Sequence, residues 1–286
     1  MSLQVPKSGI ELERRGAAAQ RGSFASVFSG WQEGRESFLF FAPHDDDSAI
    51  SVGLLIGEAR RQGIPVRIAV VTDGRNGYVS LSDRSGIVAR RIEETYVSYS
   101  VLGVAREEIT FLSFPDGDLQ NYYGRRLAEP GEPTDEHGFT GLENHFVREL
   151  RRRALVKGAL VPPTRIFVPS PADYHQDHVA VAREVPISIF HALGGIWPEC
   201  GEKVQQAPYL YWHCVYCKLP DHEEPNIRIV GSDEAFERKM RSVEAYNSQG
   251  QIADMLDGLR RAPPVEYLLE ESFSLYRPGV YDHCFS

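Results

Sequence analysis

Short apolar runs alternate along this chain with longer stretches in which apolar residues recur at helical spacing. The apolar runs predict strands at 38–43, 66–72, 107–114, 165–171 and 208–217. The other stretches predict helices at 48–63, 85–104, 142–156, 176–193 and 233–249. Strands that alternate with helices are typical of an α/β fold, so we expect a parallel sheet covered by helices on both faces.

Length and charge limit the number of domains and the class of partner. With 286 residues, 42% of them hydrophobic, the chain can bury a sizeable core. We expect an N-terminal extension at 1–36 and a single domain at 37–286. The net charge of −9 argues against nucleic acid, whose phosphates attract basic surfaces. No signal peptide or membrane-spanning run is evident, so we predict a cytoplasmic protein without membrane insertion.

The four cysteines, at 200, 214, 217 and 284, are too sparse for a disulfide framework. Cys214 and Cys217 form a C-x-x-C inside a predicted strand, but no second C-x-x-C exists to complete a structural zinc site. We therefore expect buried or partly buried thiols.

Two polar clusters follow predicted strands, and parallel sheets bind ligands beyond the carboxyl ends of their strands. HDDD at 44–47 follows the first strand, and YHQDH at 174–178 follows the fourth. Helix capping is the simplest explanation, because aspartate caps helix N-termini and its charge suits the helix dipole. A cap needs only one carboxylate, however, and three adjacent carboxylates beside a core repel one another unless a cation offsets their charge.

A divalent ion between the two clusters would resolve this repulsion. His44 and Asp47 are three residues apart across a strand-to-helix turn, and so are His175 and His178. A nitrogen and an oxygen from the first cluster and one nitrogen from the second make the ligand set of an open catalytic zinc site. A remaining carboxylate could then accept a proton from water at the site. The residues alone leave open which histidine of the second cluster binds the metal.

Several motifs, in the same order, resemble the PIG-L/LmbE-like family of zinc-dependent N-acetylglucosaminyl deacetylases over about residues 38–275. The family signature (A/P)HPDDE is similar to APHDDDSA at 42–49, and its later HxDH is similar to HQDH at 175–178. The other similar motifs are TDGRNG (72–77), RIEETYVSYSVLGV (91–104), FPDGDL (114–119), KMRSVEAYNSQ (239–249) and EESF (270–273).

The resemblance implies a fold and a set of roles. The fold would be a Rossmann-like three-layer sandwich with a mostly parallel sheet. Zinc, or Fe²⁺ on the same ligands, would be bound by His44, Asp47 and His178. Asp46 would be the general base, His175 would stabilise the oxyanion, and Asp177 would orient the neighbouring imidazole. The implied substrate contacts come from Arg91 and from Asp116, the latter to a sugar hydroxyl.

The chain departs from the family motif at two positions, with Asp45 in place of proline and Ser48 in place of glutamate. We expect Asp45 to face solvent; the alternative is that this extra carboxylate alters the metal preference or the charge around the metal ligands. Some relatives carry a mobile tyrosine two residues before the first histidine of HxDH. Here Asp173 stands at that position and Tyr174 follows it, so we do not expect a catalytic tyrosine.

The other histidines and glycines are expected to be structural. His191 and His213 lie in predicted core-facing segments, and we expect the remaining histidines, at 137, 145, 222 and 283, at the surface. No G-x-G-x-x-G follows the first strand, which argues against a dinucleotide site. The loop at 121–141 either borders the active site or is a plain surface insertion.

These patterns favour an enzyme that removes acetyl from an N-acetylglucosamine-type sugar or glycoconjugate by zinc-activated water, with a small amino-sugar substrate. One alternative is an amidase that acts on a non-sugar or thiol-conjugate amide. Another is a non-catalytic metal- or sugar-binding relative, although binding alone would not need a base such as Asp46. The oligomeric state, a homo-oligomer included, is left open.

Overall fold

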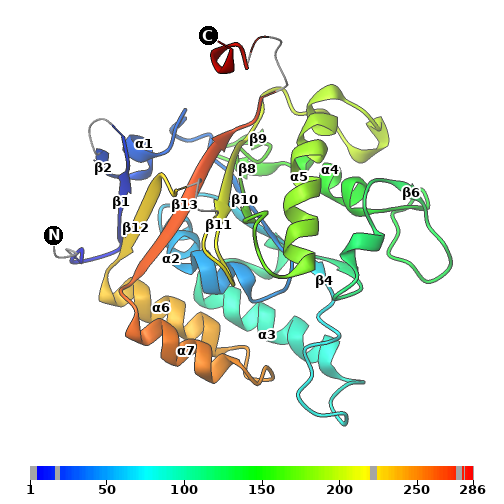
Figure 1. Ribbon diagram of the computed structural model, residues 1–286, viewed down its shortest axis with the longest axis horizontal. Coiled ribbons are helices and arrows are strands. Elements are labelled where there is room, and N and C mark those ends of the chain that lie inside the picture. The colour runs from blue at the N-terminus through cyan, green and yellow to red at the C-terminus, as the bar shows by residue number, and fades with distance from the viewer. Residues whose placement is uncertain (1–4, 17–19, 220–223, 275–278, 280, 286) are drawn as a thin grey trace.

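Nine strands form one sheet at the centre of the structure (Figure 1), a computed structural model that describes residues 5–16, 20–219, 224–274, 279 and 281–285. The strand order is β2-β1-β12-β13-β11-β10-β3-β4-β5. The bounds are β1 (Ile10–Arg14), β2 (Gln20–Gly22), β3 (Phe38–Ala42), β4 (Val66–Thr72), β5 (Ile109–Phe114), β10 (Arg165–Pro169), β11 (Tyr209–His213), β12 (Ile227–Gly231) and β13 (Val265–Ser272).

One half of the sheet is parallel and consists of the five predicted strands. β11, β10, β3, β4 and β5 pair in that order, all parallel. The chain adds β4 and β5 on one side of β3, and later adds β10 and β11 on its other side. The direction in which strands are added thus reverses at β3. Ligands of α/β proteins bind at the point where the strand order reverses, beyond the carboxyl ends of the strands.

The other half of the sheet is antiparallel, so the sheet is mixed rather than mostly parallel. β13 pairs with both β11 and β12, and β12 pairs with β1 from the N-terminal segment. The sequence pattern missed these strands, because runs such as VEYLLEES carry charged residues and resemble no buried parallel strand. Their partners are distant in the chain, and pairing between distant segments leaves no local periodicity.

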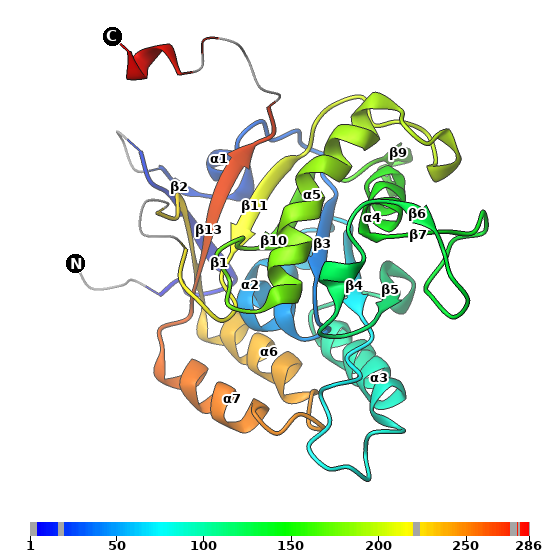
Figure 2. The ribbon, with the colours of Figure 1, turned by 45° about the vertical axis from the view of Figure 1, so that its right-hand side comes forward.

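Helices cover both faces of the sheet. Their bounds are α1 (Phe24–Val27), α2 (Asp47–Arg61), α3 (Ile87–Val101), α4 (Leu142–Arg151), α5 (Gln176–Gly194), α6 (Asp233–Glu244) and α7 (Ile252–Arg261). Buried residues of α2, α3 and α6 share one core cluster with the sheet, and those of α4 and α5 share another. Figure 2 shows α6 lying between α3 and α7, in contact with both.

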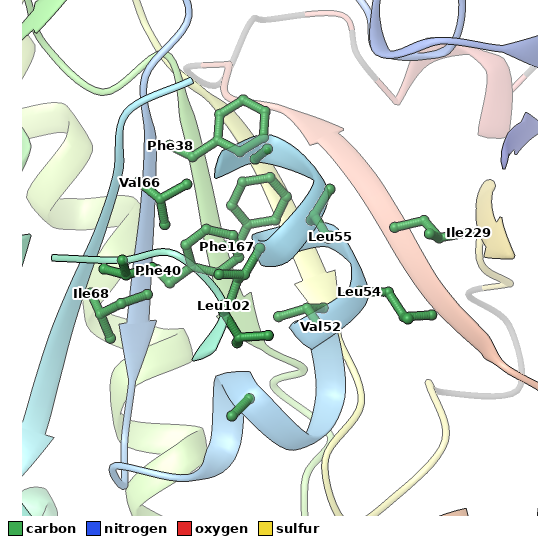
Figure 3. Close-up of a cluster of buried hydrophobic side chains, with 14 of the residues drawn as sticks. Phe38, Phe40, Val52, Leu54, Leu55, Val66, Ile68, Leu102, Phe167 and Ile229 are labelled. Atoms are coloured by element: carbon green, nitrogen blue, oxygen red, sulfur yellow. The ribbon is translucent and has the colours of Figure 1, made fainter. Parts of the chain in front are cut away.

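Alternate residues of β3 enter the two clusters, which is why its sequence is apolar throughout. Phe38 and Phe40 belong to the cluster under α2, and Leu39 and Phe41 belong to the cluster under α4 and α5. Figure 3 shows the first cluster, to which Leu55 of α2 and the rings of Phe38, Phe40 and Phe167 belong. Burying each such side chain stabilises the fold by about 1.5–3 kcal/mol.

The helix predicted at 142–156 is too long. α4 ends at Arg151, and the chain continues as a hairpin of β8 (Ala154–Val156) and β9 (Ala159–Val161). The hairpin turn is formed by Lys157 and Gly158, which both have positive φ, as a type I′ turn requires.

The late helix predicted at 233–249 is also too long, because α6 ends at Glu244. The loop at 121–141 contains a second short hairpin, formed by β6 (Arg126–Leu127) and β7 (Phe139–Thr140).

Candidate active site

The two polar clusters leave the sheet at the same edge. β3 and β10 are parallel neighbours, so the turn that begins at His44 and the turn that ends at His175 start from adjacent strand ends. Each turn leads directly into a helix, α2 after the first and α5 after the second. Side chains 134 residues apart in the sequence therefore come into contact.

Three side-chain atoms from these turns form a small buried triangle. His44 Nδ1 lies 3.2 Å from both Asp47 Oδ2 and His178 Nε2, and His178 Nε2 lies 3.0 Å from Asp47 Oδ2. Ligands at about 2.0–2.2 Å around a tetrahedral zinc ion lie about 3.3–3.6 Å from one another, slightly farther apart than these three atoms. A divalent cation fits among two imidazole nitrogens and a carboxylate oxygen at these separations. It would attract all three atoms, which otherwise crowd one another as hydrogen-bond acceptors.

A second set of carboxylates contacts the far nitrogens of the two imidazoles. His44 Nε2 lies 3.2 Å from Asp116 Oδ1 and 3.3 Å from Asp177 Oδ2. His178 Nδ1 lies 3.3 Å from Asp173 Oδ2, although the geometry is not that of a good hydrogen bond. Carboxylates in these places hold the proton on the far nitrogen, so that the near nitrogen presents a lone pair to a metal.

These carboxylates also influence the protonation of the histidines. Burial opposes a positive charge on His44, but Asp47 and then Asp116 and Asp177 outweigh it and raise its pKa well above the usual value. Burial also opposes a positive charge on His178, but the negative charge of Asp47 again outweighs it. The pKa of His178 is raised to about 9. The site thus attracts positive charge strongly, which again suits a cation.

Asp46 lies beside the triangle and is 2% exposed. Burial, followed by the negative charges of Asp47 and Asp45, raises the pKa of Asp46 to about 7. A carboxylate that titrates near neutral pH can both accept and return a proton, which is what a general base needs.

His175 faces the triangle from the first residue before α5. Its ring stands edge-on to that of His44, with centroids 4.5 Å apart. His175 Nδ1 accepts a hydrogen bond of 3.2 Å from the backbone N–H of Asp177. A neutral imidazole that accepts at Nδ1 carries its proton at Nε2, so this nitrogen can donate to a bound ligand. Burial lowers the pKa of His175, which favours the neutral form.

Asp177 joins α5 to the FPDGDL turn. Its carboxylate accepts the backbone N–H groups of Gly117 and Leu119, at 2.7 and 3.1 Å, in addition to its contact with His44. The imidazole that its side chain contacts is therefore that of His44, while its negative charge acts on His175 only from a distance. Asp116, in the same turn, also accepts the backbone N–H of Asn76 at 3.1 Å.

The expectation that Asp45 faces solvent is wrong. Asp45 is 4% exposed, and its carboxylate pairs with the Arg91 guanidinium, which reaches it from α3. Arg91 is itself buried beneath the carboxylates, so its predicted contact with substrate remains a prediction. Ser48, the other departure from the family motif, is fully buried in the first turn of α2.

The sequence pattern missed two residues at this site, Asp173 as a partner of His178 and Tyr216. The Tyr216 ring stacks on the His178 ring, with centroids 5.1 Å apart. Tyr216 follows β11, and only the pairing of β11 with β10 brings it here, so no local signal could have indicated it. Tyr174, by contrast, is 82% exposed.

The other histidines lie outside the triangle. His213 is buried, as expected, but neither of its ring nitrogens has a hydrogen-bond partner among the described residues, and burial lowers its pKa to about 3. The surface position expected for His145 is wrong, because its ring packs against Phe114 and is half-buried. His191 is half-buried, while His137 and His283 are exposed. His222 lies outside the described residues.

One known protein family has a model that matches this chain. The model of the PIG-L family, described as GlcNAc-PI de-N-acetylase, matches residues 39–187, more than half of the chain. The chain belongs to the PIG-L family. The resemblance inferred from the motifs is thereby confirmed. Curated proteins gave no significant match.

Solved structures similar to this PIG-L family member share its mixed α/β fold. N,N'-diacetylchitobiose deacetylase from Pyrococcus horikoshii is 20% identical, with a TM-score of 0.61 over 87% of this chain and 86% of that one. The conserved protein TT1542 from Thermus thermophilus is 20% identical, with a TM-score of 0.57 over 85% and 98%. GalB, the 4-carboxy-2-hydroxymuconate hydratase from Pseudomonas putida KT2440, is 14% identical, with a TM-score of 0.58 over 85% and 98%.

The neighbours therefore include both a deacetylase and a hydratase, so the fold by itself does not specify the reaction. Within the described part of the chain, no helix has the length and apolarity needed to cross a membrane.

Proposed function

We propose that this PIG-L family member is a metal-dependent N-deacetylase that hydrolyses the acetamide of an N-acetylglucosamine-type sugar or glycoconjugate. The observation that carries the proposal is the buried triangle of His44 Nδ1, Asp47 Oδ2 and His178 Nε2, with Asp46 and His175 beside it. Binding alone would need only the triangle, whereas a buried base and a neutral donor suit hydrolysis.

The donor set indicates which metals fit. His44, Asp47 and His178 would hold Zn²⁺, and two histidines with one carboxylate also suit Fe²⁺. When bound, such an ion is a Lewis acid that polarises the acetyl carbonyl and lowers the pKa of water.

The residues around the triangle would move the protons. Asp46 would accept a proton from the attacking water, since its pKa of about 7 leaves a large fraction ionised at neutral pH. His175, with its proton at Nε2, would donate to the carbonyl oxygen as negative charge develops there. The amine would then leave with a proton from Asp46 or His175, giving acetate and a free amino sugar.

The remaining site residues would position these groups. Asp177 would hold the His44 ring through its contact with Nε2. Asp116 lies at the same nitrogen through Oδ1, and its predicted contact with a sugar hydroxyl would use Oδ2, which also accepts the backbone N–H of Asn76.

An acetate-release assay tests the proposal. Purified protein is screened against N-acetylated sugars and against non-sugar amides, with a chelator and after addition of Zn²⁺ or Fe²⁺. We expect release from the sugars that is lost with the chelator and restored by metal. Release from non-sugar amides alone would indicate a general amidase, and metal binding without any release would indicate a binding protein.

The Asp46→Asn variant tests the role of the base. It should bind metal like the wild type but lose about 10²–10⁴-fold in turnover. Asp83→Asn, in an outer loop, is the matched control and should keep full turnover. Near-normal turnover by Asp46→Asn would remove Asp46 as the base.

A further inference from the structure

Asp45 stands where the PIG-L motif has proline, and it is fixed from several directions. Arg91 Nε donates to Asp45 Oδ2 at 3.1 Å, and Arg91 Nη2 pairs with Asp45 Oδ1. Thr95, one turn further along α3, places its hydroxyl oxygen 3.2 Å from Asp45 Oδ2 and 2.6 Å from the Arg91 carbonyl, and these two acceptors share its one proton. The hydroxyl of Tyr246 donates to the backbone carbonyl of Asp45 at 2.7 Å. Both the side chain and the backbone of this residue are therefore held.

The guanidinium that holds Asp45 also faces Asp46. Arg91 Nη2 lies 3.8 Å from Asp46 Oδ1, and the side chains of all three residues are almost fully buried. In such surroundings, a single arginine between two carboxylates offsets much of their mutual repulsion. The bidentate contact with Asp45 fixes the guanidinium plane, and this plane limits where the carboxylate of Asp46 can lie.

The loop TDGRNG closes over the other side of Arg91. The carbonyl of Gly74 lies 3.4 Å from Arg91 Nη1. A Cβ atom added at Gly74 would lie 2.8 Å from Arg91 Nε, and one added at Gly77 would overlap Nη1. These two glycines allow the backbone to lie directly against the guanidinium, so Arg91 has little room to turn away from the aspartates.

We infer that Asp45 and Arg91 form a positioning pair that holds the carboxylate of Asp46 beside the metal-ligand triangle. The inference rests on the proposed function, in which Asp46 accepts a proton. It assigns Arg91 a role through Asp46 instead of a contact with substrate, because a guanidinium that left Asp45 to reach substrate would leave a carboxylate buried without its partner.

Steady-state kinetics on an N-acetylated sugar that the wild type hydrolyses tests the pair. The double variant Asp45→Asn/Arg91→Gln removes both charges together, which avoids an unpaired buried charge and favours a folded protein. We expect kcat to fall about 10- to 100-fold, with KM within about twofold, because a base displaced by about 1 Å loses rate without losing binding. Arg91→Lys should recover part of the loss. Arg90→Gln, on the exposed side of α3, is the matched control and should change neither constant.

Two kinetic outcomes would overturn the inference. A KM that rises tenfold or more at unchanged kcat would make Arg91 a substrate contact. A lower melting temperature with both constants unchanged would make the pair a purely structural element.

Crystal structures of the wild type and the double variant provide a test that needs no turnover. We expect the Asp46 carboxylate to shift by about 1 Å or more while His44, Asp47 and His178 stay in place. An unmoved Asp46 would overturn the inference. Absence of wild-type turnover on every N-acetyl compound would count against the proposed function, and the structures would still decide whether the pair positions Asp46.

Discussion

His44 Nδ1 lies 3.2 Å from His178 Nε2, although the two residues are separated by 134 positions in the chain. The contact depends on the parallel pairing of β3 with β10, which places the turns after these strands next to each other. Asp47 Oδ2 completes the triangle, at 3.0 Å from His178 and 3.2 Å from His44. Removal of one of these three atoms should therefore disrupt the proposed metal site without removing a strand or helix.

His178→Ala should lose bound metal. Two remaining ligand atoms hold a divalent ion far more weakly than three, so we expect little metal after dialysis, by elemental analysis of the purified protein. His191→Ala, a half-buried histidine further along α5, is the control and should keep the wild-type metal content. A His178→Ala variant with a full equivalent of metal would contradict the assignment of this ligand.

Asp173→Asn should weaken metal binding without abolishing it. Asp173 lies 3.3 Å from His178 Nδ1, and loss of such an outer carboxylate typically costs 10- to 100-fold in metal affinity. Competition with a chromophoric chelator measures the affinity. Because Asp173 also accepts the backbone N–H of His175 at 3.1 Å, the melting temperature of the metal-free protein should be recorded alongside. An unchanged affinity with a lowered melting temperature would limit Asp173 to shaping the loop.

Lys239→Met should destabilise the fold in a pH-dependent way. Lys239 Nζ lies 2.8 Å from Glu266 Oε1, and both side chains are buried. Burial raises the pKa of Glu266, with Lys239 opposing it. A carboxyl with a raised folded-state pKa stabilises the fold below its unfolded pKa, and this contribution is lost as pH rises through the folded value. Without Lys239, the loss of folding free energy with rising pH becomes larger, because no positive charge opposes the effect of burial on Glu266.

The measurement for Lys239→Met is urea unfolding at two pH values. We expect a loss of about 3–5 kcal/mol at pH 8 and a smaller loss at pH 5, where Glu266 can be protonated. Arg238→Met, on the more exposed side of α6, should change the free energy of unfolding by no more than about 0.5 kcal/mol. Equal losses at both pH values would contradict the explanation.

Asp135→Asn should loosen the loop at 121–141. The Asp135 carboxylate accepts the backbone N–H groups of His137 and Phe139 and contacts Asn144 and Arg148 of α4. Burial opposes its charge, but these partners, Phe139 foremost, lower the pKa of Asp135 to about 2. Because the folded-state pKa is lowered, the stabilisation is present above about pH 4 and is lost as pH falls towards 2.

Hydrogen exchange of the loop amides checks this prediction. At pH 6 we expect exchange about tenfold faster in Asp135→Asn than in the wild type, since one strained or lost hydrogen bond costs about 1 kcal/mol or more. The ratio, taken at matched pH, should approach one near pH 2. Glu129→Gln, an exposed residue of the same loop, is the control. A ratio near one at pH 6 would mean that Asp135 does not hold the loop.

Local sequence was sufficient for the parallel half of the sheet and for two residues of the triangle, His44 and Asp47, but not for His178. The unbroken apolar run before His44 predicts a strand buried on both faces, and the charged residues after it can lie only at the strand end. A similar run before the second cluster places Asp177 and His178 at the start of the next helix. The family resemblance implies His178 as the metal ligand and His175 as the donor; spacing alone could not distinguish the two histidines, and this assignment stays a prediction.

Tertiary structure alone decided which polar groups meet around the triangle. Asp45 is buried because Arg91 reaches it from a helix packed beneath the turn, and Tyr216 stacks on His178 because β11 pairs with β10. The antiparallel strands β12 and β13 depend likewise on distant partners. Hydrophobic periodicity reports which face of an element is buried, whereas the charge that lies opposite a given carboxylate depends on how the elements pack.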